Sequence, residues 1–175
     1  MELKSVKCWR RRGVLRKLSK NRAWLEKKCL PKLTGTTLFV GIEKYTKDYH
    51  KLVKGKLHTV ELNKKLAKYG SPHGHFTKNF MDFKPRRKYD NVVLFGLFGQ
   101  THSWTNKMWK IKKAHLHAHE MLKKGGNLIS GHRCGVKIST IQWTAFFEDW
   151  VGGHCYLPLE IAVLDRQFIF WGGKT

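Results

Sequence analysis

Short apolar runs alternate with amphipathic stretches along most of the chain. Residues 37–42 form a run typical of a buried strand, and the stretch after them repeats its apolar side chains at helical spacing. Residues 57–62 form a second strand-like run that contains an acidic position near its end. This order predicts a β-α-β unit, with Gly41 at the tip of its first strand and Glu61 at the tip of its second.

The same alternation continues through the middle of the chain. Asn63 is placed to cap a short helix that stops at Gly70. Residues 75–80 and 91–96 predict a third and a fourth strand. The few residues between these strands include Pro85, which leaves no room for a full crossover helix.

The last third of the chain changes character. A long helix is expected over residues 102–124, followed by a fifth strand over 127–130. An aromatic-rich helix over 142–150 precedes two β-rich runs, 157–164 and 167–171, which predict a hairpin. This order predicts a three-layer, doubly wound α/β domain whose seven-stranded sheet ends in an antiparallel hairpin.

A basic segment precedes this domain. Its apolar positions recur at three- and four-residue steps, which predicts one helix or two short ones over residues 6–30, ended by Pro31. We therefore divide the chain into a basic N-terminal helical segment, residues 1–32, and an α/β domain, residues 33–175. The side chains of this segment that we expect to contact phosphate are Arg10, Arg11, Arg12, Arg16 and Lys17.

The net charge of the chain indicates a class of partner. There are 35 basic and 12 acidic side chains, a net charge of +23, and residues 133–175 hold four of each sign. Such a surplus repels itself in a compact fold and attracts polyanions. We therefore favour a nucleic acid, RNA first, over a highly charged small ligand, with further phosphate contacts from Arg86, Arg87 and Lys88.

Composition and length bound the remaining alternatives. The 41% apolar content is ordinary for a folded domain, and 175 residues are enough to bury a core. No run of 18 apolar residues occurs, so no membrane span is expected. The four scattered cysteines are interpreted as reduced thiols of an intracellular protein, with the cytoplasm favoured and the nucleus, an organelle and the oligomeric state left open.

The spacing of two residues carries the most direct chemical information. Glu61 lies 20 positions after Gly41. Across a doubly wound sheet, this spacing allows an acidic side chain at one strand tip to meet the hydroxyls of a ribose.

On these residues, the chain resembles the class I S-adenosylmethionine-dependent methyltransferases over about residues 34–175. The turn Gly41-Ile-Glu-Lys-Tyr45 is similar to their first motif, and residues 91–99 are similar to the floor beneath the transferred methyl group. Leu122-Lys-Lys-Gly-Gly126 is similar to the element before their fifth strand, and the terminal hairpin matches their last strand pair.

The resemblance implies S-adenosylmethionine as the cofactor and methyl transfer as the activity. It implies Gly41, Glu43 and Tyr45 at the methionine end, Glu61 at the ribose, Leu62 beside the adenine, and Asn79 or else Asp82 near the adenine amino group. Gly96 and its neighbours over residues 95–98 would shape the transfer site. No catalytic acid or base is assigned.

The chain departs from the family pattern at two motifs. The first turn has one glycine where the family has Gly-x-Gly-x-Gly. The fourth-strand motif is Leu94-Phe-Gly-Leu-Phe98 rather than Asp/Asn-Pro-Pro-Tyr, so no side chain there accepts an amine hydrogen. Methylation of base amino groups by that route is therefore not expected.

Other functions stay open at this point. The chain could be a non-catalytic nucleic-acid-binding protein on a methyltransferase scaffold, or a small-molecule methyltransferase. No metal site is predicted, because His115 and His119 share a helical face without the further ligands of a zinc motif. His132 or His154 is a candidate general base beside the acceptor.

Overall fold

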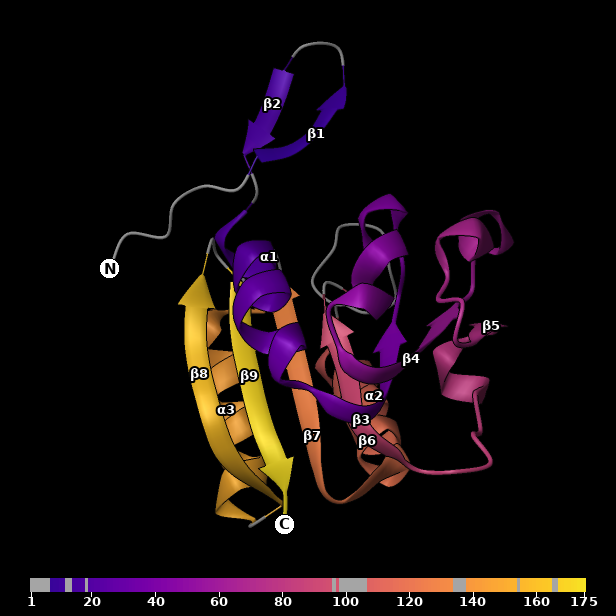
Figure 1. Cartoon of the computed structure of the whole chain (residues 1–175). Coiled ribbons are helices and arrows are strands. Elements are labelled where there is room, and N and C mark those ends of the chain that lie inside the picture. Colours follow the sequence, from indigo (N-terminus) through magenta and orange to yellow (C-terminus); the bar gives the residue numbers. More distant parts are fainter. Residues whose placement is uncertain are drawn as a thin grey trace.

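A seven-stranded mixed sheet forms the centre of the molecule (Figure 1). The computed structural model describes residues 7–11, 14–17, 19–95, 97, 107–133, 138–153, 155–164 and 167–175. The strands of the sheet are β3 (Thr34–Val40), β4 (Lys54–Glu61), β5 (His75–Thr77), β6 (Tyr89–Phe95), β7 (Leu122–Arg133), β8 (Tyr156–Leu164) and β9 (Gln167–Lys174). They lie in the order β5-β4-β3-β6-β7-β9-β8; the first five are parallel, and β9 is antiparallel to both of its neighbours.

The strand order places a switch point between β3 and β6. From β3 the chain moves outward to β4 and β5, and it then returns to β6 on the other side of β3. Open α/β sheets bind ligands beyond the carboxyl ends of their strands at such a point. The seven-stranded sheet with its terminal antiparallel hairpin confirms the fold class predicted from the sequence.

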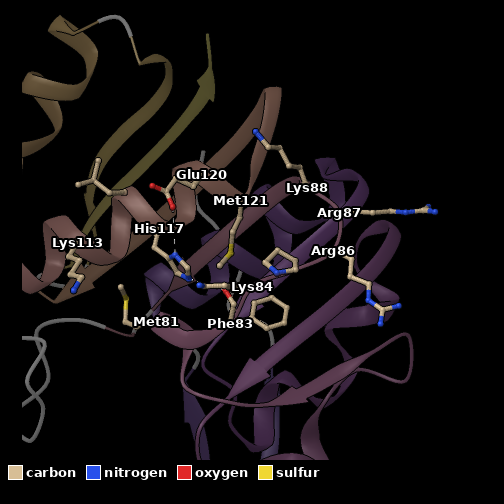
Figure 2. Close-up of a pocket in the computed structure, with 12 residues that line it drawn as sticks. Met81, Phe83, Lys84, Arg86, Arg87, Lys88, Lys113, His117, Glu120 and Met121 are labelled. Carbon is tan, nitrogen blue, oxygen red and sulfur yellow. Dashed lines mark hydrogen bonds and ion pairs between the residues drawn. The ribbon is translucent and has the colours of Figure 1, made fainter.

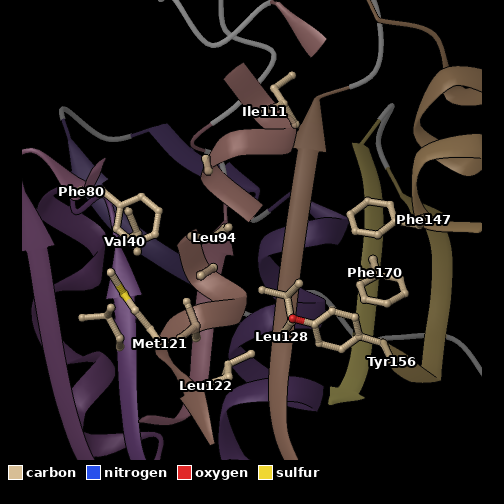
Figure 3. Packing of buried hydrophobic residues seen from close by; sticks show 14 of the residues in the cluster. Val40, Phe80, Leu94, Ile111, Met121, Leu122, Leu128, Phe147, Tyr156 and Phe170 are labelled. Carbon is tan, nitrogen blue, oxygen red and sulfur yellow. The ribbon is translucent and has the colours of Figure 1, made fainter. Parts of the chain in front are cut away.

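Helices cover both faces of the sheet. One face carries α1 (Lys20–Trp24), the π-helical turn η1 (Leu25–Cys29) and the 3₁₀ helices η2 (Leu30–Lys32), η3 (Lys44–Lys51) and η4 (Lys64–Tyr69). The other face carries η5 (Phe80–Asp82), α2 (Met108–Met121) and α3 (Thr140–Gly152). The hydrophobic cluster on this second face includes Ile111, Leu128 and Phe147 (Figure 3).

Several local expectations are confirmed. The Asn63 side chain caps η4 by accepting a hydrogen bond from the Lys65 backbone N–H at 3.0 Å, and the helix ends before Gly70. The connection from β5 to β6 contains only the single turn η5, so the crossover helix is missing as expected. Within the described residues, no helix is long and apolar enough to cross a membrane.

The helical prediction for the N-terminal segment is wrong over its first half. The sequence predicts helix over residues 6–30, within the basic segment 1–32, whereas β1 (Lys7–Arg11) and β2 (Val14–Lys17) form an antiparallel hairpin apart from the main sheet (Figure 1). Helix begins only at Lys20. Helical spacing of apolar residues did not outweigh the β propensity of Trp9 and Val14 around Gly13.

The long helix also ends earlier than its pattern predicts. α2 stops at Met121, and β7 begins at Leu122, where the sequence favoured helix to residue 124. Leu122 is fully buried opposite Tyr89, and Lys123 forms an ion pair with Asp90 on β6 at 2.8 Å. Pairing with the neighbouring strand therefore takes these residues from the helix.

Helix α1 joins the start of the domain to the terminal hairpin. The Trp24 indole N–H donates to Glu160 Oε1 at 2.8 Å, and its ring meets the Trp171 ring edge-on at 6.2 Å between centroids. The Asn21 amide donates to Gln167. Residues far apart in the sequence thus close the hydrophobic cluster on this face.

Candidate functional site

The carboxyl end of β3 turns sharply at Gly41. This residue has a φ of 78°, and its N–H donates to the Val60 carbonyl at the end of β4, at 3.0 Å. Among the described residues, a Cβ at this position would meet only Leu97 Cδ1, at 3.7 Å. With no side chain of its own, the Gly41 turn can be approached closely by a ligand, as far as the described residues are concerned.

The carboxylate of Glu61 lies beside this turn. Its Oε2 accepts a hydrogen bond from the Ile42 N–H at 3.1 Å, and its Oε1 accepts one from the Asn63 N–H at 2.8 Å. The carboxylate therefore joins the Gly41 turn to the loop after β4. Each oxygen has a second lone pair that can accept another hydrogen bond, so the half-buried group can also bind hydroxyls.

The two residues after Gly41 make contacts of their own. Ile42 is 2% exposed and belongs to the hydrophobic cluster under α1. Glu43 is exposed and begins η3, where its N–H donates to Thr46 Oγ1 at 3.2 Å. Glu43 and Tyr45 stand where the family has its other two glycines, and neither comes within 4 Å of a Cβ placed at Gly41.

Tyr45 is held by a residue that the sequence did not single out. The Arg22 guanidinium lies over the Tyr45 ring, 3.9 Å from its centroid, and Arg22 also pairs with Glu26 at 2.7 Å. Burial raises the pKa of Tyr45 to about 12, so its hydroxyl stays protonated at neutral pH. The helical spacing of Arg22 and Glu26 was a visible signal of their ion pair, but it gave no sign of the contact with Tyr45.

The predicted adenine-side residues lie along the loops after β4 and β5. Leu62, directly after Glu61, is 65% exposed, so it offers an apolar surface at the strand tip. The Asn79 side chain caps η5 by accepting from the Met81 N–H at 3.1 Å. Asp82 is exposed at the end of η5. Register places Thr77 opposite Glu61, two residues before Asn79.

The structure describes two of the residues that are predicted to form the floor over 95–98. Phe95 is buried in the hydrophobic cluster that also contains Ile42, and its ring stacks on Trp24 at 6.3 Å between centroids. Leu97 borders the Gly41 turn. Gly96 and Phe98 lie outside the described residues.

The predicted phosphate-binding residues form two groups. Arg86, Arg87 and Lys88 are exposed in the connection that leads into β6. Arg10, Arg11, Arg16 and Lys17 lie on the β1–β2 hairpin, where the structure describes the backbone alone. Arg12 lies outside the described residues.

A buried hydrogen-bond chain links α2 and β7. His115 Nδ1 donates to the Ile111 carbonyl at 2.8 Å, so its Nε2 is free of hydrogen and accepts from the Ser130 hydroxyl at 2.7 Å. His132 Nε2 in turn donates to Ser130 Oγ. Both imidazoles are fully buried, and burial lowers the pKa of His115 to about 4 and holds that of His132 well below its ordinary value.

These buried contacts exclude His132 as a general base. His132 is covered by Trp143 of α3, whose ring stacks on it at 4.1 Å between centroids. It is therefore part of the core and does not reach an acceptor at the edge of the sheet. His154 lies outside the described residues. Across the described ranges, no three His, Cys, Asp or Glu side chains are grouped to hold a metal ion.

Comparisons with solved structures identify the fold. The N-methyltransferase NodS from Bradyrhizobium japonicum WM9 is similar with a TM-score of 0.62 and 13% identity, covering 81% of this chain and 86% of NodS. An rRNA methylase from Streptococcus thermophilus has a TM-score of 0.55 and 13% identity, covering 83% and 89%.

The magnesium protoporphyrin IX methyltransferase from Synechocystis PCC 6803, solved with bound S-adenosylmethionine, has a TM-score of 0.60 and 13% identity, covering 87% of this chain and 76% of that one. No protein-family model and no curated sequence matches the chain. The chain therefore has the fold of the class I S-adenosylmethionine-dependent methyltransferases.

Proposed function

We propose that this protein, which has the class I methyltransferase fold, binds S-adenosylmethionine and transfers its methyl group to RNA. The observation that carries the proposal is the Gly41 turn, with the Glu61 carboxylate hydrogen-bonded to its next residue, Ile42, and exposed Leu62 directly after Glu61. These three features stand at the switch point of the sheet, where folds of this type bind ligands.

The residues at this edge fit the chemical groups of the cofactor. Gly41 allows the close approach of the methionine portion, Glu61 accepts the ribose hydroxyls, and Leu62 packs on the adenine. The backbone N–H groups of Ile42 and Asn63 hold the carboxylate in place before the ribose arrives. When bound, S-adenosylmethionine supplies an electrophilic methyl group and leaves as a neutral thioether, so the protein acts mainly by positioning.

RNA is favoured as the acceptor because of charge. The net charge of +23 and the exposed Arg86, Arg87 and Lys88 suit a polyanion. An rRNA methylase is among the proteins of similar fold, although others act on a porphyrin or transfer to nitrogen in their own substrates. The assignment of RNA as the acceptor therefore depends on the charge of this chain rather than on its fold.

Calorimetric titration with S-adenosylmethionine tests the proposal, after bound cofactor and nucleic acid have been stripped from the protein. We expect micromolar binding, followed by transfer of a labelled methyl group to total RNA. Transfer of the labelled methyl group to small molecules, with none to RNA, would support a small-molecule methyltransferase instead. No binding at millimolar cofactor would overturn the proposal in favour of a non-catalytic RNA-binding protein.

Replacing Gly41 with valine is expected to remove cofactor binding and to lower stability. The positive φ costs a β-branched residue about 1–3 kcal/mol, and its side chain fills the space beside the strand tip. The measurements are calorimetric titration and thermal unfolding. Gly173, where a Cβ meets nothing within 4 Å, provides the control Gly173→Ala, which should leave cofactor affinity unchanged. Full affinity in Gly41→Val would contradict the assigned role.

A further inference from the structure

A groove of about 640 Å³ lies between α2 and the chain segment that leads into β6 (Figure 2). It exists because the connection from β5 to β6 contains one helical turn, η5, and no crossover helix to pack against α2. One wall is formed by residues 83–88, and the other by Lys113, Leu116, His117 and Glu120 of α2. Met81 and Met121 also line it.

The groove is held open by fixed contacts. His117 Nε2 on α2 lies 3.0 Å from both the Phe80 and the Phe83 carbonyl oxygens, so it carries the hydrogen that the two carbonyls share. The Phe80 and Phe83 side chains are 8% and 4% exposed in the core. The segment is therefore attached to α2 at one end and continues into β6 at the other.

The walls carry a strong surplus of positive charge. Five basic side chains line the groove, Lys84, Arg86, Arg87, Lys88 and Lys113, against the single carboxylate of Glu120. All five are exposed, and none forms an ion pair with a carboxylate in the described part of the chain. Arg86 and Arg87 extend outward from the rim (Figure 2). Five unneutralised cations along one groove suit a ligand with repeated negative charge.

An exposed aromatic ring continues the α2 wall. Trp109 is 60% exposed and lies on the same helical face as Lys113, Leu116 and Glu120, at steps of three and four residues. The face from Glu120 to Trp109 is about 17 Å long at 1.5 Å per residue. Because α2 follows β6 and precedes the parallel strand β7, its first turn lies toward the carboxyl edge of the sheet, where Gly41 and Glu61 are found.

We propose that this groove binds the phosphate backbone of a single-stranded RNA segment, with a base stacked on Trp109, and leads that segment toward the carboxyl edge of the sheet. Repeated phosphates match the row of cations, and an exposed indole next to a cationic groove is a surface on which any base can stack. The inference rests on the proposed function for its class of ligand.

Fluorescence anisotropy with a labelled, mixed-sequence RNA of roughly 20 nucleotides tests the groove, at salt concentrations from about 50 to 200 mM. The groove variant combines Lys84→Gln, Arg86→Gln, Arg87→Gln and Lys88→Gln. The slope of log affinity against log salt should be smaller in magnitude by about 3 than in the wild type. Each phosphate contact with a single strand contributes about 0.7 to this slope, and the variant removes four cations.

A matched variant removes the same charge elsewhere. It combines Lys51→Gln, Lys54→Gln, Lys56→Gln and Lys68→Gln, four exposed lysines outside the groove. We expect it to keep most of the wild-type salt slope. Equal losses in the two variants would overturn the groove in favour of diffuse attraction to surface charge.

Trp109→Ala separates stacking from charge. It should weaken RNA binding on the order of tenfold and leave the salt slope unchanged, because a base–aromatic contact releases no counterions. Unchanged affinity would remove Trp109 from the site.

Cofactor titration distinguishes failure of the groove from failure of the proposed function. The groove variant should bind S-adenosylmethionine as the wild type does, because its substitutions lie outside the Gly41 and Glu61 site. RNA binding that depends on the groove in a protein without cofactor affinity would sustain the groove and overturn the enzyme. If the protein binds S-adenosylmethionine but the groove variant has the same RNA salt slope as the wild type, the enzyme would be sustained and the groove would be overturned.

Discussion

Glu61→Ala is expected to abolish S-adenosylmethionine binding while the protein remains folded. The carboxylate is the acceptor that the ribose hydroxyls need, and it is already oriented by the Ile42 and Asn63 N–H groups. Hydrogen bonds to a charged group contribute about 1.5–3 kcal/mol each, so the loss of two should lower affinity at least about 100-fold. Calorimetric titration measures the affinity, and thermal unfolding without cofactor measures the fold.

Two further variants separate charge from shape at this position. Glu61→Gln keeps one oxygen acceptor but loses the charge, so we expect an intermediate affinity. Asp48→Ala removes an exposed carboxylate on η3 that pairs with Lys51 and should leave affinity unchanged. Unaltered cofactor affinity in Glu61→Ala would show that the ribose is bound elsewhere, and the proposed site would be lost with it.

Acid is expected to destabilise the fold steeply below about pH 6.5. His115 and His132 are neutral in the core, whereas in the unfolded chain they gain protons at their ordinary pKa near 6.5. The unfolded state therefore binds more protons as pH falls, and stability is lost from that pH down to the folded pKa, about 4 for His115. His115 alone should cost about 3 kcal/mol over this window.

Uncharged aromatic rings pack against both imidazoles. His115 faces Phe146, Phe147 and Trp150, and His132 faces Trp143 and Phe147. The charge of each imidazole would also oppose that of the other, since their Nε2 atoms are 3.2 Å apart. Urea unfolding at several pH values between 7 and 5 measures the loss.

His132→Phe tests whether these two residues cause the pH dependence. The phenyl ring can keep the stack on Trp143 but cannot gain a proton, so the slope of stability against pH should fall by about one proton. A wild-type stability that stays constant from pH 7 to 5 would contradict the buried neutral pair.

The sequence predicted the features that depend on local pattern and chain order. Alternating apolar runs and short loops determine parallel pairing, and parallel pairing brings the carboxyl ends of neighbouring strands to one edge. The proximity of Gly41 and Glu61 therefore followed from their places at two strand tips. The missing crossover helix was visible because too few residues separate β5 from β6.

Contacts across long sequence separations could not be read in the same way. The chain of His115, Ser130 and His132 joins a helix to a strand, and the spacing of these residues matches no local motif. The helical stripe over residues 6–17 was mistaken because periodicity does not report strand pairing within a short hairpin. The stack of Phe95 on Trp24 likewise joins two segments that are distant in the sequence.

The contacts of α1 with the terminal hairpin have a consequence for how the protein folds. Asn21 and Gln167 are 146 positions apart, and Trp24 and Glu160 are 136 apart, so forming either contact closes a very long loop. Closing such a loop costs conformational entropy before the stabilising contacts form, and this cost slows folding. We therefore expect Trp24 to stay uncovered until β8 and β9 have paired with β7.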